Sequence, residues 1–447
     1  MLLFAGSRAA AQHIQLQQIN ICGNRTTRQA IILRELSLQA GDSFPADSAA
    51  ALLALNTLRL NSLALFTEVH LDWDTLGATV WNLNITVKER WYLWPKVEVK
   101  LADRNFNVWW QEQHRDLNRI DLSLALTHQN FRGNLEVLTA GIKVGYTQGL
   151  MLGYQLPYFN QKQTRGLGCS LVYTRNRELA FATDSNRLLF ARSSQLRFLT
   201  EQFYASVNYT YRPAYHATHQ FFLGYRSLQV ADTVTGLQPD FFPGNKQAFR
   251  FLEATYRLSL NYTDNWSYPT RGSKLVNYTG WRQGLDGSVQ VYVNPEAGLF
   301  LRPFPGILTS HIFRGRFSLP QQQPFYWNSA MGYGSEYVRG FEHYVTEGPH
   351  FALGRSSIKF QLLDRVFRKL PFRYLPSLPV AIYPKIFADA GYSWQPLAAH
   401  ASFLTNRLLY SAGMGVDIVT AYDLKLRVEW TRNSLGQWGW FLHLDSE

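Results

Sequence analysis

Much of the chain alternates apolar and polar residues with a period of two. Three stretches show this clearly, residues 203–212, 252–261 and 424–431, in which one face is apolar and the other carries polar or charged side chains. Runs of about 10 residues with an apolar outward and a polar inward face are typical of transmembrane barrels, whereas strands of soluble sandwiches have about five or six residues. We therefore predict a membrane all-β fold, with an antiparallel transmembrane β-barrel over residues 91–447.

The length of this region sets the number of strands. About 350 residues at roughly 22 residues per strand with its connection predict about 16 strands, and an even number is expected for a bacterial barrel. Closure gives every backbone N–H and C=O a partner within the barrel, which a lipid environment requires.

Residues 12–90 follow a different pattern, which predicts a small α+β domain in the order β-α-α-β-β. Residues 14–21 alternate as a strand and are followed by a turn at Gly23 and Asn24. Thr26 and Gln29 form a capping-box pattern for a first helix, which we expect to end at Gly41. A second helix is predicted over residues 46–63, and two strands over residues 65–71 and 79–87.

Composition supports a membrane protein without spanning helices. Hydrophobic residues make up 46% of the chain and aromatic residues 15%, whereas charged residues make up only 17%, against about 25% in soluble proteins. The sequence contains no apolar run of the length that a transmembrane helix needs. Composition alone is also compatible with a soluble β-sandwich or propeller. The length and alternation of the predicted strands favour the barrel.

The net charge of +12 suggests a negatively charged partner. Lys and Arg are spread along the chain, and the sequence has no helix-turn-helix or zinc-finger pattern, so we predict no nucleic-acid binding. Anionic lipid head groups are the expected partner. Cys22 and Cys169 fall in different predicted domains, and we expect two unpaired thiols.

The first residues suggest the remnant of a secretion signal. Ala9, Ala10 and Ala11 form a small-residue cleavage pattern, with Gln12 as the mature start. The preceding apolar stretch is short and lacks a basic start, so residues 1–11 are interpreted as a truncated signal peptide, with a disordered tail as the alternative.

No pattern for catalysis, metal binding or a cofactor emerges. His216 and His219 lack carboxylate or cysteine neighbours that would complete a metal site. Gly334 and Ser335 lack the frame of a nucleophile elbow, and no nucleotide-binding pattern lies between a strand and a helix. We therefore predict that the chain is not an enzyme and needs no cofactor.

The N-terminal domain resembles the POTRA domain. The matching positions are Gly23-Asn24, Thr26-Thr27, Gly41-Asp42, Leu65-Phe66 with Val69, and Val87-Lys88-Glu89-Arg90. The resemblance implies a periplasmic domain that binds extended client segments at a sheet edge. A structural plug or spacer is the alternative.

The barrel region resembles the superfamily of BamA/TamA-like insertases and two-partner-secretion transporters, with a bacterial surface antigen-type barrel. Residues 130–134, 154–159 and 265–272 match, but the most specific segments are Val338-Arg339-Gly340-Phe341 and Phe387-Ala388-Asp389-Ala390-Gly391. The resemblance implies that the first segment is the tip of a loop folded into the lumen, where Arg339 meets the strand that carries Asp389. An exposed surface-loop arginine is the alternative.

Two features depart from that superfamily. Its adjoining strand commonly offers a glutamate, but residues 356–361 contain none. Its last strand usually ends on an aromatic residue, whereas here Trp440 and Phe441 are followed by residues 442–447, which contain no aromatic ring except His443.

The barrel must close its first strand on its last, and we expect this lateral seam between residues 96–101 and 439–444. Pro95 cannot donate a ladder hydrogen bond, and the last strand is expected to be short, so the seam should be weakly paired. Facing positions are Val97 or Val99 against Trp440 or Leu442. An open seam exposes an edge that templates another strand.

These expectations combine into one functional hypothesis. The resemblance implies an outer-membrane protein assembly, insertion or translocation factor whose N-terminal domain lies in the periplasm. Its partners would be unfolded outer-membrane or secreted client proteins, outer-membrane lipid and possible periplasmic accessory subunits. A secretion transporter that threads its client through the lumen and a passive channel or structural barrel are the alternatives.

Overall fold

The computed structural model describes residues 13–63, 65–103, 106–160, 162–193, 198–265, 267–368, 377–396, 402–420 and 424–446. The predicted signal peptide, residues 1–11, and its cleavage site lie outside this part of the chain. Among the helices described, none has both the length and the apolar character needed to cross a bilayer. The chain separates into two units: Met1–Lys96 with Ala125–Ala140 and Gly153–Gly168 form the first, and the remaining residues form the second.

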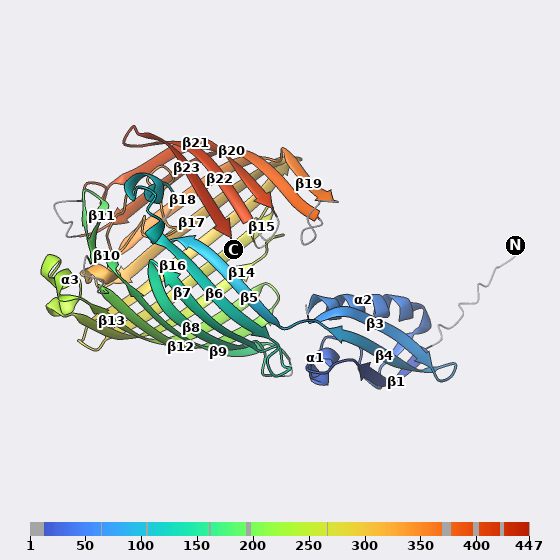
Figure 1. The fold of residues 1–447 in the computed structure, drawn as a ribbon. Coiled ribbons are helices and arrows are strands. Elements are labelled where there is room, and N and C mark those ends of the chain that lie inside the picture. Colours follow the sequence, from blue (N-terminus) through green and yellow to red (C-terminus); the bar gives the residue numbers. More distant parts are fainter. Residues whose placement is uncertain are drawn as a thin grey trace. The chain divides into compact units, whose positions relative to one another are not determined.

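The first unit contains a four-stranded sheet in the order β2-β1-β4-β3. Its strands are β1 (His13–Cys22), β2 (Ser43–Pro45), β3 (Phe66–Thr75) and β4 (Val80–Glu89), and its helices are α1 (Gln29–Leu33), η1 (Ala46–Ser48) and α2 (Ala49–Ser62) (Figure 1). Ile14, Leu16, Leu60 and Leu83 are fully or almost fully buried in its core. The observed order is the predicted β-α-α-β-β with one added short strand, β2.

The prediction for the first helix was wrong in two respects. Arg28 precedes the helix and makes no side-chain cap, and α1 ends at Leu33, well before Gly41. The backbone N–H groups of Thr26 and Thr27 donate instead to the Glu89 carboxylate at the end of β4. A carboxylate distant in sequence thus holds the backbone ahead of the helix, and the residues before Gly41 lead into β2.

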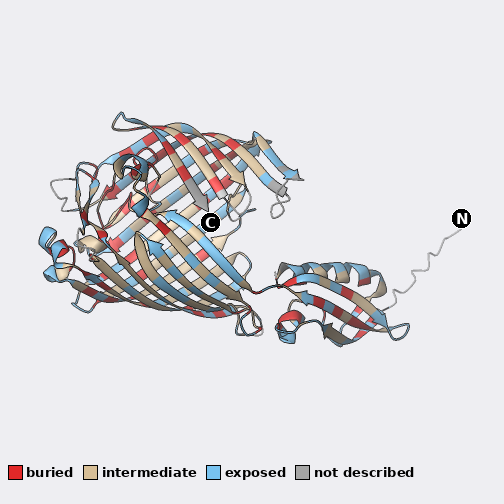
Figure 2. Ribbon diagram, in the orientation of Figure 1, coloured by how far each residue is buried: buried red, intermediate tan, exposed pale blue. Residues whose placement is uncertain are grey.

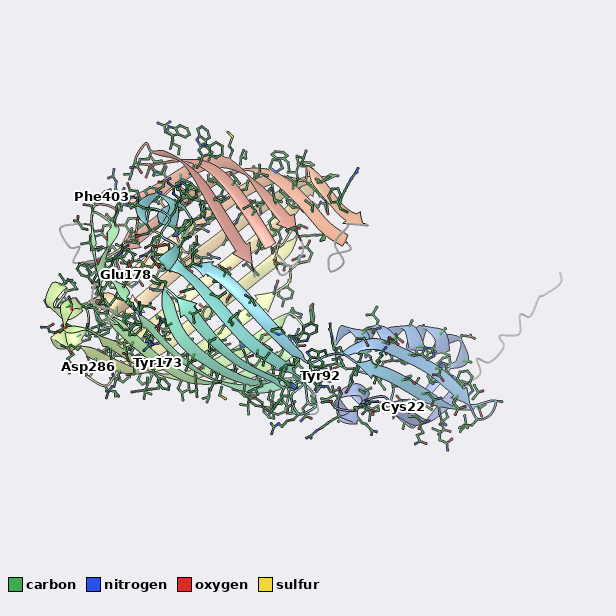
Figure 3. All side chains as sticks on the ribbon, in the orientation of Figure 1. Cys22, Tyr92, Tyr173, Glu178, Asp286 and Phe403 are labelled. Atoms are coloured by element: carbon green, nitrogen blue, oxygen red, sulfur yellow. The ribbon has the colours of Figure 1, made fainter. Side chains whose placement is uncertain are left out.

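Contacts within the first unit also join this domain to the turn between β6 (Ile120–Gln129) and β7 (Val137–Gly145). The Thr27 hydroxyl lies 3.0 Å from the Tyr92 hydroxyl and accepts a hydrogen bond from the Asn130 amide at 2.8 Å. Tyr92 is labelled in Figure 3. All three side chains are buried, so the turn is part of the domain's packing.

The remaining strands, except β10 (Glu178–Asp184) and β11 (Arg187–Arg192), form a closed barrel, which confirms the predicted fold class. In chain order, the barrel strands are β5 (Leu93–Leu101), β6, β7, β8 (Thr147–Leu156), β9 (Arg165–Asn176), β12 (Thr200–Ala214), β13 (Ala217–Val230), β14 (Ala248–Asn261), β15 (Gly272–Gly284), β16 (Val289–Phe304), β17 (Ile307–Leu319), β18 (His350–Phe360), β19 (Leu363–Arg368), β20 (Ser377–Trp394), β21 (Leu408–Thr420), β22 (Leu424–Asn433) and β23 (Trp438–Ser446).

The number of strands agrees with the prediction. The described residues form seventeen segments, and two of these, β18 and β19, pair antiparallel with successive parts of β20. They are therefore one interrupted strand, and the barrel consists of sixteen strands.

The barrel has the reverse of a soluble protein's burial pattern. On β14, Leu252 is 44% exposed, whereas the next residue, Glu253, is only 8% exposed. Glu253 pairs with Arg226 and Arg282 on the neighbouring strands. Figure 2 shows this alternation of exposed and buried positions along many strands. Apolar side chains that point outward and charged ones that point inward fit a surface covered by lipid.

Short elements connect the strands of the second unit. The hairpin of β10 (Glu178–Asp184) and β11 (Arg187–Arg192) forms a separate sheet, and the connection from β5 to β6 contains η2 (Val108–Glu112) and η3 (Leu117–Arg119). The other short helices are α3 (Asp232–Leu237), η4 (Pro243–Asn245) and η5 (Phe325–Trp327). Cys22 and Cys169 are free and exposed, as predicted.

Candidate functional site: a charged network inside the barrel

The connection between β17 and β18 carries the segment Val338–Phe341. Its two arms pair through Ser329 and Glu347, and the Ala330 N–H donates to the Thr346 carbonyl at 2.9 Å. Val338, Arg339 and Phe341 are all buried, with exposures of 1%, 6% and 2%. We call residues 320–349 the tip loop. Its tip lies against the inner side of β20 and β22.

Arg339 and Asp389 are brought together in a two-pronged ion pair. The Arg339 Nη2 and Nε atoms donate to the two Asp389 carboxylate oxygens at 2.5 and 2.8 Å, and the Arg339 backbone N–H adds a third bond at 3.1 Å. The Asp389 side chain is fully buried. A planar guanidinium suits this geometry because its donors form a rigid fork that matches a carboxylate.

The neighbouring motif residues shape the seat of this arginine. The guanidinium carbon lies 3.8 Å from the centre of the Phe387 ring, a cation–π contact. Gly391 leaves room for Val338, because a β-carbon there would lie 2.6 Å from the Val338 Cγ2 atom. The structure thus brings together the residues that the resemblance singled out: Val338, Arg339, Gly340 and Phe341 with Phe387, Asp389 and Gly391.

The backbone conformation at Gly340 and the space around it both exclude a side chain at this position. Its φ of +87° is a left-handed conformation, and a β-carbon would lie 2.8 Å from the Thr431 Cγ2 atom on β22. The Gly340 carbonyl accepts a hydrogen bond from the Asn433 amide at 2.8 Å. The backbone of the tip loop is therefore held directly against β22.

Sequence reasoning missed the second carboxylate that binds Arg339. Residues 356–361 supply no glutamate, and Ser357 contributes its hydroxyl instead, 3.2 Å from Arg339 Nη2. Glu429 on β22 accepts from Arg339 Nη1 at 3.2 Å and from Lys385 Nζ at 2.7 Å. The position of Glu429 on the polar face of residues 424–431 indicated that its side chain points into the barrel. The strand pattern did not indicate that Arg339 is its partner.

Lys385 extends the network to a second group of buried charges. Its ammonium also contacts Asp417 on β21, and Lys359 lies 3.3 Å from the same carboxylate. The Tyr268 hydroxyl, from the turn over residues 265–272, donates to Asp417 at 2.8 Å. Within that turn, Trp266 lies outside the described residues. The network therefore reaches from the tip loop to the turn between β14 and β15.

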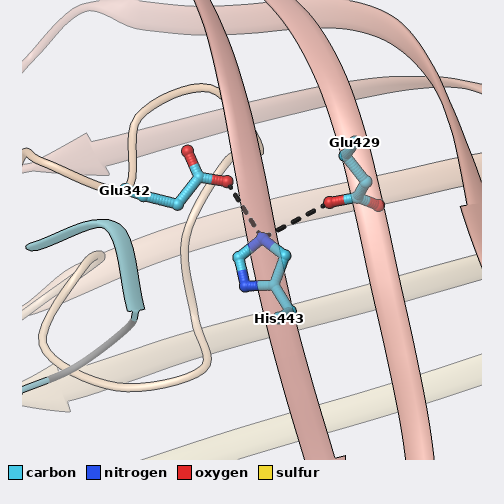
Figure 4. Close-up of side chains that lie close together, drawn as sticks. All are labelled: Glu342, Glu429 and His443. Atoms are coloured by element: carbon cyan, nitrogen blue, oxygen red, sulfur yellow. Dashed lines mark ion pairs between the residues drawn. The ribbon is translucent and has the colours of Figure 1, made fainter. Parts of the chain in front are cut away.

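One group in the described residues has the donors of a metal site. Glu342, Glu429 and His443 are buried with their ligand atoms close together (Figure 4). His443 Nε2 lies 3.5 Å from Glu342 and 3.4 Å from Glu429, and its Nδ1 lies 3.1 Å from the Tyr337 hydroxyl. One imidazole and two carboxylates suit zinc. However, Arg339 and Lys385 already neutralise Glu429, so we interpret the group as part of the buried polar network and not as a metal site.

The predicted seam strands are neighbours in the barrel, because β5 follows β23 in the strand order. Val97 and Val99 are each 65% exposed and Trp440 is 67% exposed, whereas Leu442 is half-buried. The last strand, β23, is short as predicted, because its nine residues are fewer than those of most other barrel strands. The expectation of few ladder bonds at its end was wrong, because β23 pairs with β22 from Trp438 to Ser446.

No family model matches the sequence, and no curated protein does. Solved structures do match. BamA from Haemophilus ducreyi lacking POTRA domains 1–3 aligns with a TM-score of 0.67 at 15% identity, over 97% of this chain and 84% of that one. CdiB from Acinetobacter baumannii gives 0.53 at 12% identity, over 97% and 73% of the two chains.

CdiB from Escherichia coli is also similar, with a TM-score of 0.55 at 9% identity, over 96% of this chain and 76% of that one. At these identities the comparison concerns the fold. It shows that this chain has a β-barrel with the fold of BamA and CdiB. The outward apolar and inward charged faces of its strands fit a surface covered by lipid.

Proposed function

We propose that the chain resides in the outer membrane and takes part in inserting proteins into that membrane or moving them across it. The observation that carries the proposal is the tip loop. Its arginine is bound by two buried carboxylates inside a barrel whose fold is that of BamA and CdiB. The first and last strands adjoin in that barrel, and we propose that the route into the bilayer opens where they meet.

We further propose that the N-terminal domain is a periplasmic, POTRA-like domain that captures extended client segments. Among the residues that the structure describes, the sheet order is β2-β1-β4-β3, so β3 has one edge of ten residues without a strand partner, whereas β2 at the other edge has only three residues. An extended peptide adds to such an edge through main-chain hydrogen bonds, which accept many sequences. This tolerance suits unfolded outer-membrane or secreted clients.

The insertion step would take place at the seam between β5 and β23. An opened seam presents N–H and C=O groups in a row, and a client strand can pair with them as it enters the bilayer. In lipid, a backbone group that forms a hydrogen bond is more stable than an unpaired one. Folding of the client therefore supplies the free energy for its insertion. The proposal therefore requires no catalytic side chain, nucleotide or cofactor. Accessory subunits and outer-membrane lipid would assist the capture and the insertion of the client.

A secretion transporter is the second candidate, supported by the similarity to both CdiB structures. In that case the tip loop would leave the lumen and a client would pass through the space it vacates. Removal of the tip loop should then open a large pore, and locking the seam should have no effect.

The deciding experiment locks the seam with disulfides. Cys22 and Cys169 are free, so both are first changed to serine. Cysteines are then introduced in pairs at Val97 or Val99 and at Trp440 or Leu442, and several pairs are scanned for register. Oxidised protein in liposomes should fail to fold an unfolded outer-membrane client into a protease-resistant form, and reduction should restore the activity. A locked barrel that inserts clients normally would rule out the seam mechanism.

A further inference from the structure

The connection between β5 and β6 contains a side chain bound to the backbone of the last strand. The Asn107 side-chain nitrogen Nδ2 donates to the Trp440 carbonyl at 2.6 Å, and the Leu442 N–H donates to the Asn107 side-chain oxygen Oδ1 at 3.0 Å. Asn107 is 7% exposed. One amide thus satisfies one acceptor and one donor, two positions apart on β23.

The pairing of β22 and β23 identifies which edge of β23 is involved. The Asn433 N–H donates to the Gln437 carbonyl at the turn, and Trp430 stands opposite Trp440 in the ladder. Because hydrogen-bonded positions alternate in an antiparallel ladder, residues 439, 441 and 443 point their N–H and C=O groups toward β22. Trp440 and Leu442 point theirs to the opposite edge, where β23 meets β5. Asn107 therefore occupies the seam edge.

The segment that holds Asn107 is anchored on both sides. Arg119 follows the segment and Asp103 precedes it; Arg119 is buried and pairs with Asp103 at 2.7 Å and with Glu178 of β10 at 2.5 Å (Figure 3). Between Asn107 and Arg119, the Glu112 carboxylate lies 2.7 Å from the Nδ1 atom of His343, which follows Phe341 of the tip loop by two residues. The segment therefore links the seam edge to the tip loop.

We propose that the β23 edge at Trp440 and Leu442 is a binding site for an extended polypeptide, and that residues 106–113 are its resident competitor. The inference rests on the proposed function and adds to it a specific site and a gate. Asn107 makes two hydrogen bonds there, whereas a strand added along the edge of β23 makes more. A client segment therefore displaces the amide, and the His343 contact transmits that displacement to the tip loop.

The test measures peptide binding to the intact chain in nanodiscs. The probe is a fluorescent peptide of residues 93–101, the strand that follows β23 in the barrel. Asn107→Ala should bind it about tenfold more tightly than the wild type, since the peptide no longer competes with two hydrogen bonds of ordinary strength. The matched control, Asn118→Ala, removes an amide of the same connection that bonds to Asp116 and should bind like the wild type.

Hydrogen exchange of the Leu442 amide provides a second readout, and it should accelerate in Asn107→Ala alone. Unchanged exchange would overturn the proposal, because Asn107 would not hold that amide. Faster exchange without tighter peptide binding would also overturn it, because the released edge would then close onto β5. Neither readout requires insertion. If the peptide binds as expected but no variant inserts a client, the proposed function fails and the binding site stands.

Discussion

At the scale of single residues, the position of the tip loop depends on one buried guanidinium, that of Arg339. Arg339 cannot lose its proton in a protein, so its burial requires anions in good geometry. Asp389 and Glu429 supply them from two strands, and Phe387 covers the remaining face. Because the arginine belongs to the tip loop and its partners belong to the barrel wall, this contact decides whether the loop stays inside.

We expect Arg339→Ala to release the tip loop while the barrel still folds. The change leaves Asp389 buried without its main partner, which costs on the order of 3–5 kcal/mol. Limited proteolysis should cut residues 320–349 faster, and conductance in planar bilayers should rise. Arg226→Ala is the matched control, because Arg226 pairs with Glu253 on the barrel wall and not with a carboxylate that binds Arg339. Equal behaviour of the two variants would contradict this role of Arg339.

Gly340→Ala should weaken the same loop for a different reason. The positive φ and the contact with Thr431 both penalise a β-carbon, and we expect a loss of about 1–3 kcal/mol. Gly306→Ala separates the two causes, because Gly306 has a φ of +79° but open space around its α-carbon. Thermal unfolding in detergent should show the larger loss for Gly340→Ala. A larger loss at Gly306 would exclude the steric explanation.

At the scale of elements, the N-terminal domain joins its helical face to its sheet through Glu89. Burial opposes ionisation of this carboxyl, but hydrogen bonds from Thr27 and Thr26 outweigh it and hold the pKa of Glu89 below its usual value. A group with a depressed pKa stabilises the folded state above its unfolded pKa, and this contribution is lost as the pH falls through the folded pKa.

We therefore expect the segment before α1 to open in acid. Amide exchange at Thr26 and Thr27 in the full chain should be slow at neutral pH and should accelerate, relative to the intrinsic rate, once the pH falls below the ordinary glutamate range. Glu89→Gln should show the fast exchange at neutral pH and lose the acid dependence. Glu68→Gln, which removes an exposed surface pair with Lys88, should behave like the wild type. A wild-type acid response in Glu89→Gln would assign the transition to another group.

At the scale of the whole molecule, the barrel surface carries apolar side chains such as Leu223, Phe221 and Val207, each at least half exposed. Such a surface requires detergent or lipid in place of water. The purified chain should therefore aggregate in plain buffer. In detergent it should migrate faster unheated than boiled on a semi-native gel, because a closed barrel is compact. A soluble monomer without detergent would contradict a membrane barrel.

Much of the fold could be predicted because its causes are local. Alternation along each strand reports which side chains face lipid, and chain length then limits the number of strands. The first helix was predicted less well. It ends at Leu33, and the backbone ahead of it is held by Glu89 at the end of β4, a carboxylate 63 residues from Thr26. The motif residues around Arg339 were found through a resemblance, and no periodicity would have joined them.

The sequence by itself determined that this chain forms a barrel behind a small α+β domain, because the periods of its hydrophobic pattern are properties of neighbouring residues. Only the tertiary structure decided that Glu429 binds Arg339 and that Asn107 occupies the edge of β23. These residues lie 90 and 333 positions from their partners. Contacts at such distances depend on strand register and on the path of connecting loops. Both are set by closure of the whole barrel, and neither is encoded in any single segment.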